Sequence, residues 1–141
     1  MTPEQIALVQ SSFQRLGPEL PDMTARFYRQ LFSRDPSLHA LFTTDQALQE
    51  ARFADKLTEI VRAMPRLGDL LELTRELGAR HVGYGVRVSH YAIVGDALFA
   101  ALGAVLGDHF DAATRDAWSV GYNLVAETML EGAATARNVR S

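Results

Sequence analysis

Apolar residues recur every three or four positions along most of the chain, which is the period of α-helices that bury one face. No stretch shows a convincing alternation of period two, the pattern of a half-buried β-strand. The pattern predicts helices from Pro3 to near Gly17, from Pro21 onward, briefly from Pro36, over residues 43–64 and 67–81, from a Ser89 cap to Gly107, and from about Asp111 to Ala136. The chain is therefore predicted to be an all-α domain of six or seven helices.

Residues at the helix boundaries support these limits. Thr2 is placed to cap the first helix, with Pro3 at its first position and Gln5 positioned to complete a capping box. Glycine and proline fall mainly between the predicted helices, so the connections are short and the helices should pack closely. Residues 136–141 carry two arginines and no strong pattern, and we expect them to fray.

Length and composition indicate one globular domain over residues 1–141, because 48% of the residues are hydrophobic and 22% are charged. A net charge of −3 gives no general reason to expect a basic surface that binds nucleic acid or a membrane. The N-terminus lacks the basic start and apolar core of a signal peptide, and no apolar run approaches the roughly 18–20 residues of a membrane span. We therefore expect a cytoplasmic protein without a membrane span.

The chain contains no cysteine, which excludes disulfides, thiolate zinc sites, iron–sulfur clusters and covalently attached c-type haem. A metal or cofactor ligand should then come from one of four histidines. His109 falls in a predicted turn and His90 at the start of a helix, where a solvated side chain is the simpler interpretation. His39 lies in the short helix, which offers no second ligand.

His81 differs from the other histidines because it continues the apolar stripe of its helix, which contains Leu70, Leu73 or Thr74, and Leu77. A buried imidazole needs partners for its ring nitrogens, so either a hydrogen-bonded core histidine or a metal ligand fits. No HExxH motif or two-histidine helical pair points to zinc. A single histidine suits haem, since the porphyrin supplies the other four iron ligands.

A haem pocket that holds dioxygen also needs polar groups, and the sequence offers two. Tyr28 lies on the apolar side of the second helix, and Gln49 precedes Phe53 by one turn at the head of the fourth helix's inward stripe. Each has a simpler interpretation, Tyr28 as a core aromatic with its hydroxyl at the surface and Gln49 as a solvent-facing residue. Both alternatives stay open on these residues alone.

Several motifs together resemble the globin family, specifically the bacterial single-domain globins and the globin domains of flavohaemoglobins. The similarity runs from Pro3 to about Gly132. The segments that carry it are "RFYRQLF", "DPSLHALF", "RHVGYGV", "HYAIVGDAL" and "DAWSVGYNLVA". The resemblance implies a globin fold, in which a three-on-three helical sandwich surrounds a haem pocket.

The resemblance also implies roles for individual residues. His81 would be the proximal iron ligand of one non-covalent haem b, and Tyr28 and Gln49 the distal pair that faces dioxygen. The haem slot would be lined by Phe42, Phe53, Leu77, Val86, Tyr91 and Val94, and we expect Arg52, one turn after Gln49, to pair with a haem propionate or else to be a solvated surface arginine. Flavohaemoglobin-type globins commonly carry a glutamate late in the last helix that links to the proximal tyrosine and histidine. Here an ungapped count places Ala133 at that position, with Glu127 and Glu131 the nearest acids.

These implications lead to a hypothesis of reversible dioxygen binding, for storage or delivery, by a monomer or homodimer that would also bind NO and CO. A first alternative is nitric oxide dioxygenation for detoxification, which would need an external reductase because no flavin or nicotinamide domain follows the globin part. A haem-based sensor is a second alternative. A haem-free helical domain, with His81 in the core and Gln49 at the surface, is a third.

Overall fold

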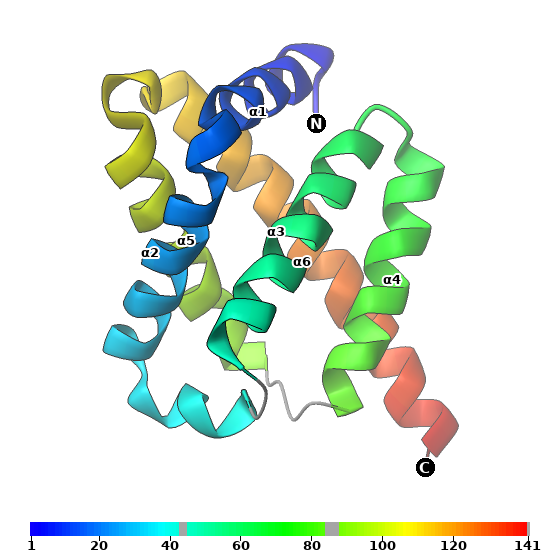
Figure 1. Ribbon diagram of the computed structural model, residues 1–141. Coiled ribbons are helices and arrows are strands. Elements are labelled where there is room, and N and C mark those ends of the chain that lie inside the picture. The colour runs from blue at the N-terminus through cyan, green and yellow to red at the C-terminus, as the bar shows by residue number, and fades with distance from the viewer. Residues whose placement is uncertain (43–44, 84–87, 141) are drawn as a thin grey trace.

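The computed structural model describes the backbone of residues 1–42, 45–83 and 88–140, and the side chains of those residues apart from 82–83 and 137–140. These ranges contain helices and no strand, so the all-α prediction is confirmed. Figure 1 shows the α-helices, which are α1 Pro3–Leu16, α2 Leu20–Arg34, α3 Gln46–Ala63, α4 Leu67–Gly83, α5 Val88–Leu106 and α6 Ala112–Arg140. Short 3₁₀ turns separate some of them, namely η1 Gly17–Glu19, η2 Pro36–Leu41 and η3 Gly107–His109.

The first helix begins as its sequence predicts. The Thr2 side chain accepts a hydrogen bond from the Gln5 backbone N–H at 3.1 Å, and the Gln5 side chain accepts one from the Thr2 N–H at 2.8 Å. This capping box satisfies two of the amide groups that a helix N-terminus leaves without partners. At the other end of α1, Gly17 has a φ of +46°, which a residue with a side chain would adopt only under strain.

Three expected boundaries differ in the structure. Ser89 does not cap α5, because the helix already includes Val88. The segment from Pro36 forms a 3₁₀ helix rather than an α-helix, capped by the Asp35 carboxylate, which accepts from the Ser37 N–H at 3.1 Å. The last helix continues to Arg140, past its expected end at Ala136. Fraying of the tail stays a prediction.

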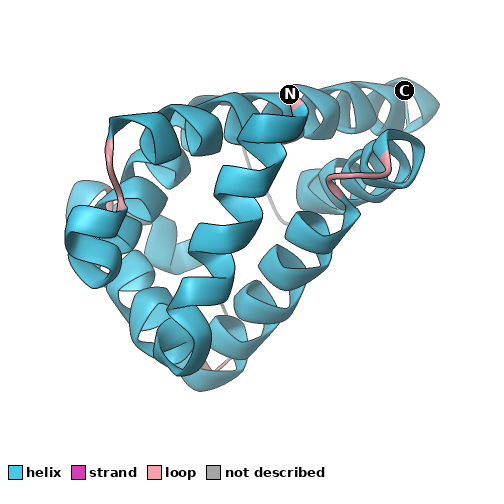
Figure 2. Ribbon diagram, turned by 90° about the horizontal axis from the view of Figure 1, so that it is seen from above, coloured by secondary structure: helices cyan, strands magenta, loops and turns pink. Residues whose placement is uncertain are grey.

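The core forms where helices pack in pairs, with the largest contacts between α4 and α6 and between α2 and α5. Figure 2 shows the helices arranged around this interior. The Trp118 indole N–H donates to the Ser12 hydroxyl at 2.8 Å, so even the polar atoms buried between α1 and α6 have a partner. This packing fixes the ends of α2, α3, α4 and α5, which carry the candidate site.

The expectation that no apolar run approaches the length of a membrane span was wrong. The segment Val88–His109, with a mean hydropathy of 1.5, is long and apolar enough to cross a bilayer by length and composition. However, Ala97, Leu98, Ala101 and Leu102 of this helix are buried in the core, and core helices pass the same test. Packing of this face against the core therefore accounts for part of the apolar character of the helix.

Candidate functional site

Most of the predicted site residues lie near helix ends at one end of the molecule. Figure 1 shows the start of α3 and the end of α4 at the same end, close to the start of α5. The start of α3 carries Gln49, Arg52 and Phe53, whereas Leu77 and His81 lie near the end of α4. Tyr91 and Val94 lie in the first turns of α5, Phe42 follows η2, and Tyr28 lies in α2. Val86 lies outside the described residues.

His81 is half-buried, and its ring is oriented by its own helix. The His81 Nδ1–H donates to the Leu77 backbone carbonyl at 2.7 Å. Burial lowers the pKa of His81 below its ordinary value, although the hydrogen bond to Leu77 opposes this shift. A neutral ring that donates through Nδ1 carries its lone pair on Nε2, and a backbone carbonyl behind Nδ1 is the usual support of a metal-bound histidine.

Tyr28 is buried, with only 4% of its surface exposed. Its hydroxyl donates to the Gln49 backbone carbonyl at 3.3 Å, which ties α2 to the first turn of α3. Burial, with a smaller contribution from the Glu50 charge, raises the pKa of Tyr28 to about 12. The phenol therefore stays protonated, as a hydrogen-bond donor, throughout the physiological pH range.

Aromatic rings surround this tyrosine. Phe27 and Phe53 stack with ring centroids 4.3 Å apart, while Phe42 and Phe53 present their edges to Tyr28 at 5.5 and 5.9 Å. Edge-on contacts of this kind fix ring orientation and add to the stabilisation from burial. The result is a rigid apolar wall with one polar atom, the Tyr28 hydroxyl, at its border with Gln49.

The other residues of this end are less enclosed. Gln49 is half-buried rather than fully solvated, whereas Arg52 is exposed and makes no ion pair with any described residue. Several apolar side chains are only partly buried although they pack against the core, namely Phe42, Phe53, Leu77, Ile93 and Val94. Such incompletely covered apolar surface on neighbouring elements is what a flat apolar cofactor would cover.

Two tyrosines connect α5 and α6. The Tyr122 hydroxyl donates to the Tyr91 backbone carbonyl, which fixes the first turns of α5 against α6. Burial, followed by the charges of Tyr91 and Asp96, raises the pKa of Tyr122, so this donor also stays protonated. The sequence motifs included Tyr122 but gave no sign of this contact.

Neither candidate acid reaches a buried position. Glu127 is exposed, and Glu131 is 65% exposed and pairs with Arg75 across 3.5 Å. Ala133, at the position where flavohaemoglobin-type globins commonly carry glutamate, is buried. A carboxylate contact to the histidine is therefore not among the interactions that position His81 within the described part of the chain.

The three remaining histidines lie in different surroundings. His39 is exposed and stacks on Phe32 with ring centroids 3.7 Å apart, and His109 is exposed with Nε2 3.5 Å from an Arg15 nitrogen. His90 is half-buried, which is more than its expected surface position implied. No group of three or more His, Asp or Glu side chains among the described residues could hold a metal ion.

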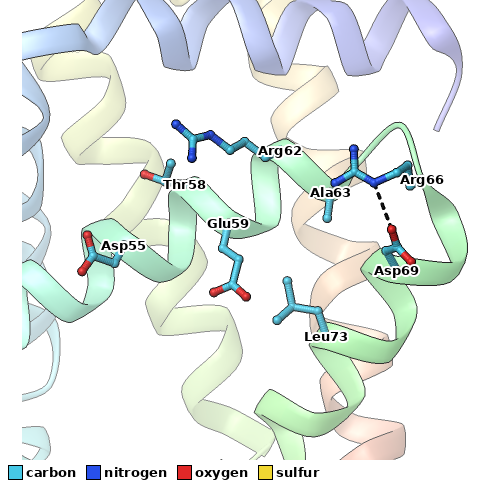
Figure 3. Close-up of a pocket in the computed structure, with 8 residues that line it drawn as sticks. All are labelled: Asp55, Thr58, Glu59, Arg62, Ala63, Arg66, Asp69 and Leu73. Carbon is cyan, nitrogen blue, oxygen red and sulfur yellow. Dashed lines mark hydrogen bonds and ion pairs between the residues drawn. The ribbon is translucent and has the colours of Figure 1, made fainter.

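A groove of about 450 Å³ lies away from these residues, between the second half of α3 and the first half of α4. Figure 3 shows its lining, which includes an ion pair between Arg66 and Asp69 at 2.9 Å. Charges of both signs line the groove, as Asp55, Glu59 and Arg62 do, so it differs from an apolar cofactor slot. It lies at the opposite end of α3 and α4 from Gln49 and His81.

The donor set at the His81 end fits haem. Porphyrin needs one axial imidazole in the correct tautomer and apolar surface for its faces, and the structure has both. A metal ion held only by protein atoms would need several more ligands, which the described residues do not bring together.

Comparison with known proteins agrees with this arrangement. The sequence profile of the globin family matches residues 25–129, well over half of the chain. The chain belongs to the globin family. The bacterial globin of Campylobacter jejuni is 25% identical, with a TM-score of 0.85 over 97% of this chain and 99% of that one, so the predicted globin fold is confirmed.

Two further relatives are informative. A flavohemoprotein of Bordetella pertussis is 29% identical over 133 residues, which are 92% of this globin but 33% of that protein. The chain thus spans about a third of the length of the curated relatives that it matches. An engineered carbene transferase, a variant of a candidate nitric oxide dioxygenase from Rhodothermus marinus, is 25% identical, with a TM-score of 0.87 over 99% of this chain and 97% of that one.

Proposed function

We propose that this globin binds one non-covalent haem b, with His81 as the axial ligand, and that it binds dioxygen reversibly. The hydrogen bond from His81 Nδ1 to the Leu77 carbonyl is the observation that supports the ligand role most directly, because it selects the tautomer in which Nε2 carries the lone pair. When bound, haem supplies the iron at which a diatomic gas binds.

The chain's own residues determine how such a ligand is held. Phe42, Phe53, Leu77 and Val94 are partly buried apolar side chains packed against the core. In this proposal they line the haem pocket and limit the entry of water. Exclusion of water strengthens any hydrogen bond that the pocket makes to a partly charged ligand. Arg52, exposed at the start of α3, is the proposed partner of a propionate.

Tyr28 is the proposed first donor to dioxygen, and Gln49 the second. The Tyr28 hydroxyl now donates to the Gln49 carbonyl at 3.3 Å, which is long for an O–H···O hydrogen bond. Rotation of the hydroxyl hydrogen about the C–O bond redirects it without moving the ring, which its aromatic neighbours hold in place. A donor bond of this kind contributes about 0.5–1.5 kcal/mol, and more to a charged acceptor.

The test is addition of haem to the purified apoprotein, followed by the visible spectrum and extraction. We expect uptake of one haem per chain with the spectrum of a histidine-ligated haem, and we expect acid–acetone to extract it because no cysteine can attach it. Failure to take up stoichiometric haem would support the haem-free helical domain instead.

Nitric oxide dioxygenation is the second candidate, favoured by the flavohemoprotein relatives and by the Rhodothermus marinus protein. That reaction converts NO, dioxygen and one electron to nitrate, so turnover requires a reductase that supplies the electron. The reductase could be a separate partner. Rapid rereduction after a pulse of NO, in the presence of such a partner, distinguishes the enzyme from a carrier that stays ferric.

A further inference from the structure

Two glycines bring the backbones of α4 and α6 into direct contact, one helical turn before His81. A methyl group on Gly78 of α4 would overlap the Met129 carbonyl of α6, and one on Gly132 of α6 would overlap the Arg75 carbonyl of α4. Both overlaps are closer than 3.0 Å, which real Cβ atoms essentially never show. Figure 1 shows α6 passing behind the lower part of α4.

Conformation does not explain these glycines. Within the described backbone, only Gly17 and Gly107 have positive φ, so Gly78 and Gly132 have dihedral angles that alanine could adopt. A glycine inside a helix costs about 0.5–1 kcal/mol relative to alanine. The close approach of the two helices is therefore the physical reason that these positions lack a side chain.

The contact lies at the turn that orients the proposed ligand. Leu77, whose carbonyl accepts the His81 Nδ1–H, is the chain neighbour of Gly78. At the exposed edge of the same crossing, Arg75 of α4 pairs with Glu131 of α6 at 3.5 Å. Residues 75–78 are thus held against residues 129–132 mainly through the backbone, and the His81 ring is attached to that same turn.

We propose that Gly78 and Gly132 are positioning residues, which set how far the His81 ring reaches toward haem by fixing α4 on α6. The backbone contact would then provide the positioning that the resemblance to flavohaemoglobin-type globins assigns to a glutamate, since this chain has a buried Ala133 and an exposed Glu131 that pairs with Arg75. The inference rests on the proposed function, since it treats His81 as the iron ligand. An alanine at either glycine must push α4 outward and carry His81 with it.

The experiment compares Gly78→Ala and Gly132→Ala with one matched control on each helix. Gly68→Ala changes α4 where a Cβ meets nothing within 4 Å, and Gly121→Ala changes α6 where a Cβ meets flexible methionine ends, the Met1 and Met64 Cε atoms at 3.1 and 3.3 Å. The first measurement is the iron–histidine stretching band of the ferrous, haem-loaded proteins by resonance Raman spectroscopy. The second is the rate of haem transfer to an acceptor apoprotein.

We expect both crossing variants to shift the band beyond the spread of wild type and controls, and to lose haem about tenfold faster, whereas the controls do neither. A general loss of stability would not move the band, because the band reports the iron–nitrogen bond alone. Unshifted bands in folded Gly78→Ala and Gly132→Ala overturn the inference while leaving His81 as ligand. An unchanged spectrum in His81→Ala overturns the proposed function, and this inference with it.

Hydrogen exchange of the haem-loaded wild type tests the same proposal if the alanine variants do not fold. If the crossing fixes α4, amides of residues 75–81 exchange more slowly than those of residues 67–73 in the same helix, and as slowly as those of residues 129–135. Exchange in residues 75–81 as fast as in residues 67–73 would overturn the proposal.

Discussion

The two sides of the proposed pocket are built in different ways. On the side of α2 and α3, side chains set the geometry, because aromatic rings enclose Tyr28 and its hydroxyl donates to the Gln49 carbonyl. On the side of α4 and α6, position comes from backbone contact at Gly78 and Gly132, and from the Leu77 carbonyl behind His81. On the first side, single side chains can be replaced without moving the backbone. On the second side, the distance between two helices is fixed.

The difference predicts different responses to mutation. A side-chain wall can lose one hydroxyl and keep its shape, so conservative substitutions there should change ligand chemistry more than stability. Two helices in backbone contact cannot accommodate even a methyl group without moving, since interiors are close-packed. The following experiments, from the largest expected effect to the smallest, test this contrast.

His81→Ala should have the largest effect. Removal of the imidazole eliminates the only proposed axial ligand from the chain, so the protein should lose haem or hold it weakly with an altered iron spectrum. Titration with haem, followed by the visible spectrum, measures this. Haem affinity and spectrum equal to those of wild type would exclude His81 from the role.

Replacement of the other histidines provides the control for that result. His39→Ala, His90→Ala and His109→Ala should leave the spectrum nearly intact, since two of these side chains are exposed and none lies on the inward stripe of α4. His90 is the half-buried histidine of the three. If His90→Ala changed the spectrum as much as His81→Ala does, His81 would no longer be distinguished as the iron ligand.

Alkaline pH should destabilise the wild type through Tyr28. The pKa of Tyr28 is about 12 in the folded protein and 10.0 in its ordinary state, so the fold favours the neutral phenol. This contribution to the free energy of unfolding is fully present below pH 10 and is lost as pH rises from 10 to 12, by about 2–3 kcal/mol in total. Urea unfolding of wild type and Tyr28→Phe across this range isolates the effect, because Tyr122 titrates in both. Parallel curves for the two proteins would mean that burial does not hold the phenol neutral.

Much of the fold could be predicted from the sequence because helix periodicity and caps are local signals. The Thr2 and Gln5 capping box and the apolar stripe that includes Leu70, Leu77 and His81 are both read within a few residues. The cap of α5 was missed because Ser89 is a good cap by type, yet the helix takes in the residue before it.

The candidate site was predictable to a different degree on its two sides. Tyr28, Gln49 and His81 were identified because each is a polar residue at an apolar position, which is unusual in a single sequence. Gly78 and Gly132 gave no such signal. A glycine inside a helical pattern indicates only a weaker helix until the helix that packs against it is known. Gly78 contacts the Met129 backbone and Gly132 the Arg75 backbone, so the partners are far apart in the chain and local patterns cannot show them.

Tyr28→Phe should speed dioxygen release far more than carbon monoxide release. Dioxygen bound at haem is polarised and gains from a donor, whereas carbon monoxide is nearly neutral, so the loss of one hydroxyl discriminates between the two gases. A donor bond of about 1.4 kcal/mol corresponds to roughly tenfold in the oxygen equilibrium. We expect Tyr28→Phe to cost at least that much, and Gln49→Leu to cost less, because the longer amide side chain can swing aside. Flash photolysis and stopped-flow give the release rates, and equal changes for both gases would mean that the tyrosine only fills space.

Arg52→Ala should have the smallest effect. It tests whether an exposed side chain at the edge of the pocket helps to hold haem. Arg52 is exposed at the start of α3, and the described residues provide it with no ion-pair partner, so its guanidinium is available to a carboxylate that arrives with the cofactor. An exposed pair of this kind contributes about 0.2–1 kcal/mol, which corresponds to haem loss at most about fivefold faster. The effect should shrink as salt increases, because solvent-exposed charges are screened.

The matched control is Arg62→Ala. Arg62 is an exposed arginine of the same helix that lines the distant groove, so its replacement should not change haem loss. Identical haem loss from both variants at low salt would make Arg52 an ordinary surface arginine, and the apolar slot with His81 would then hold haem without it.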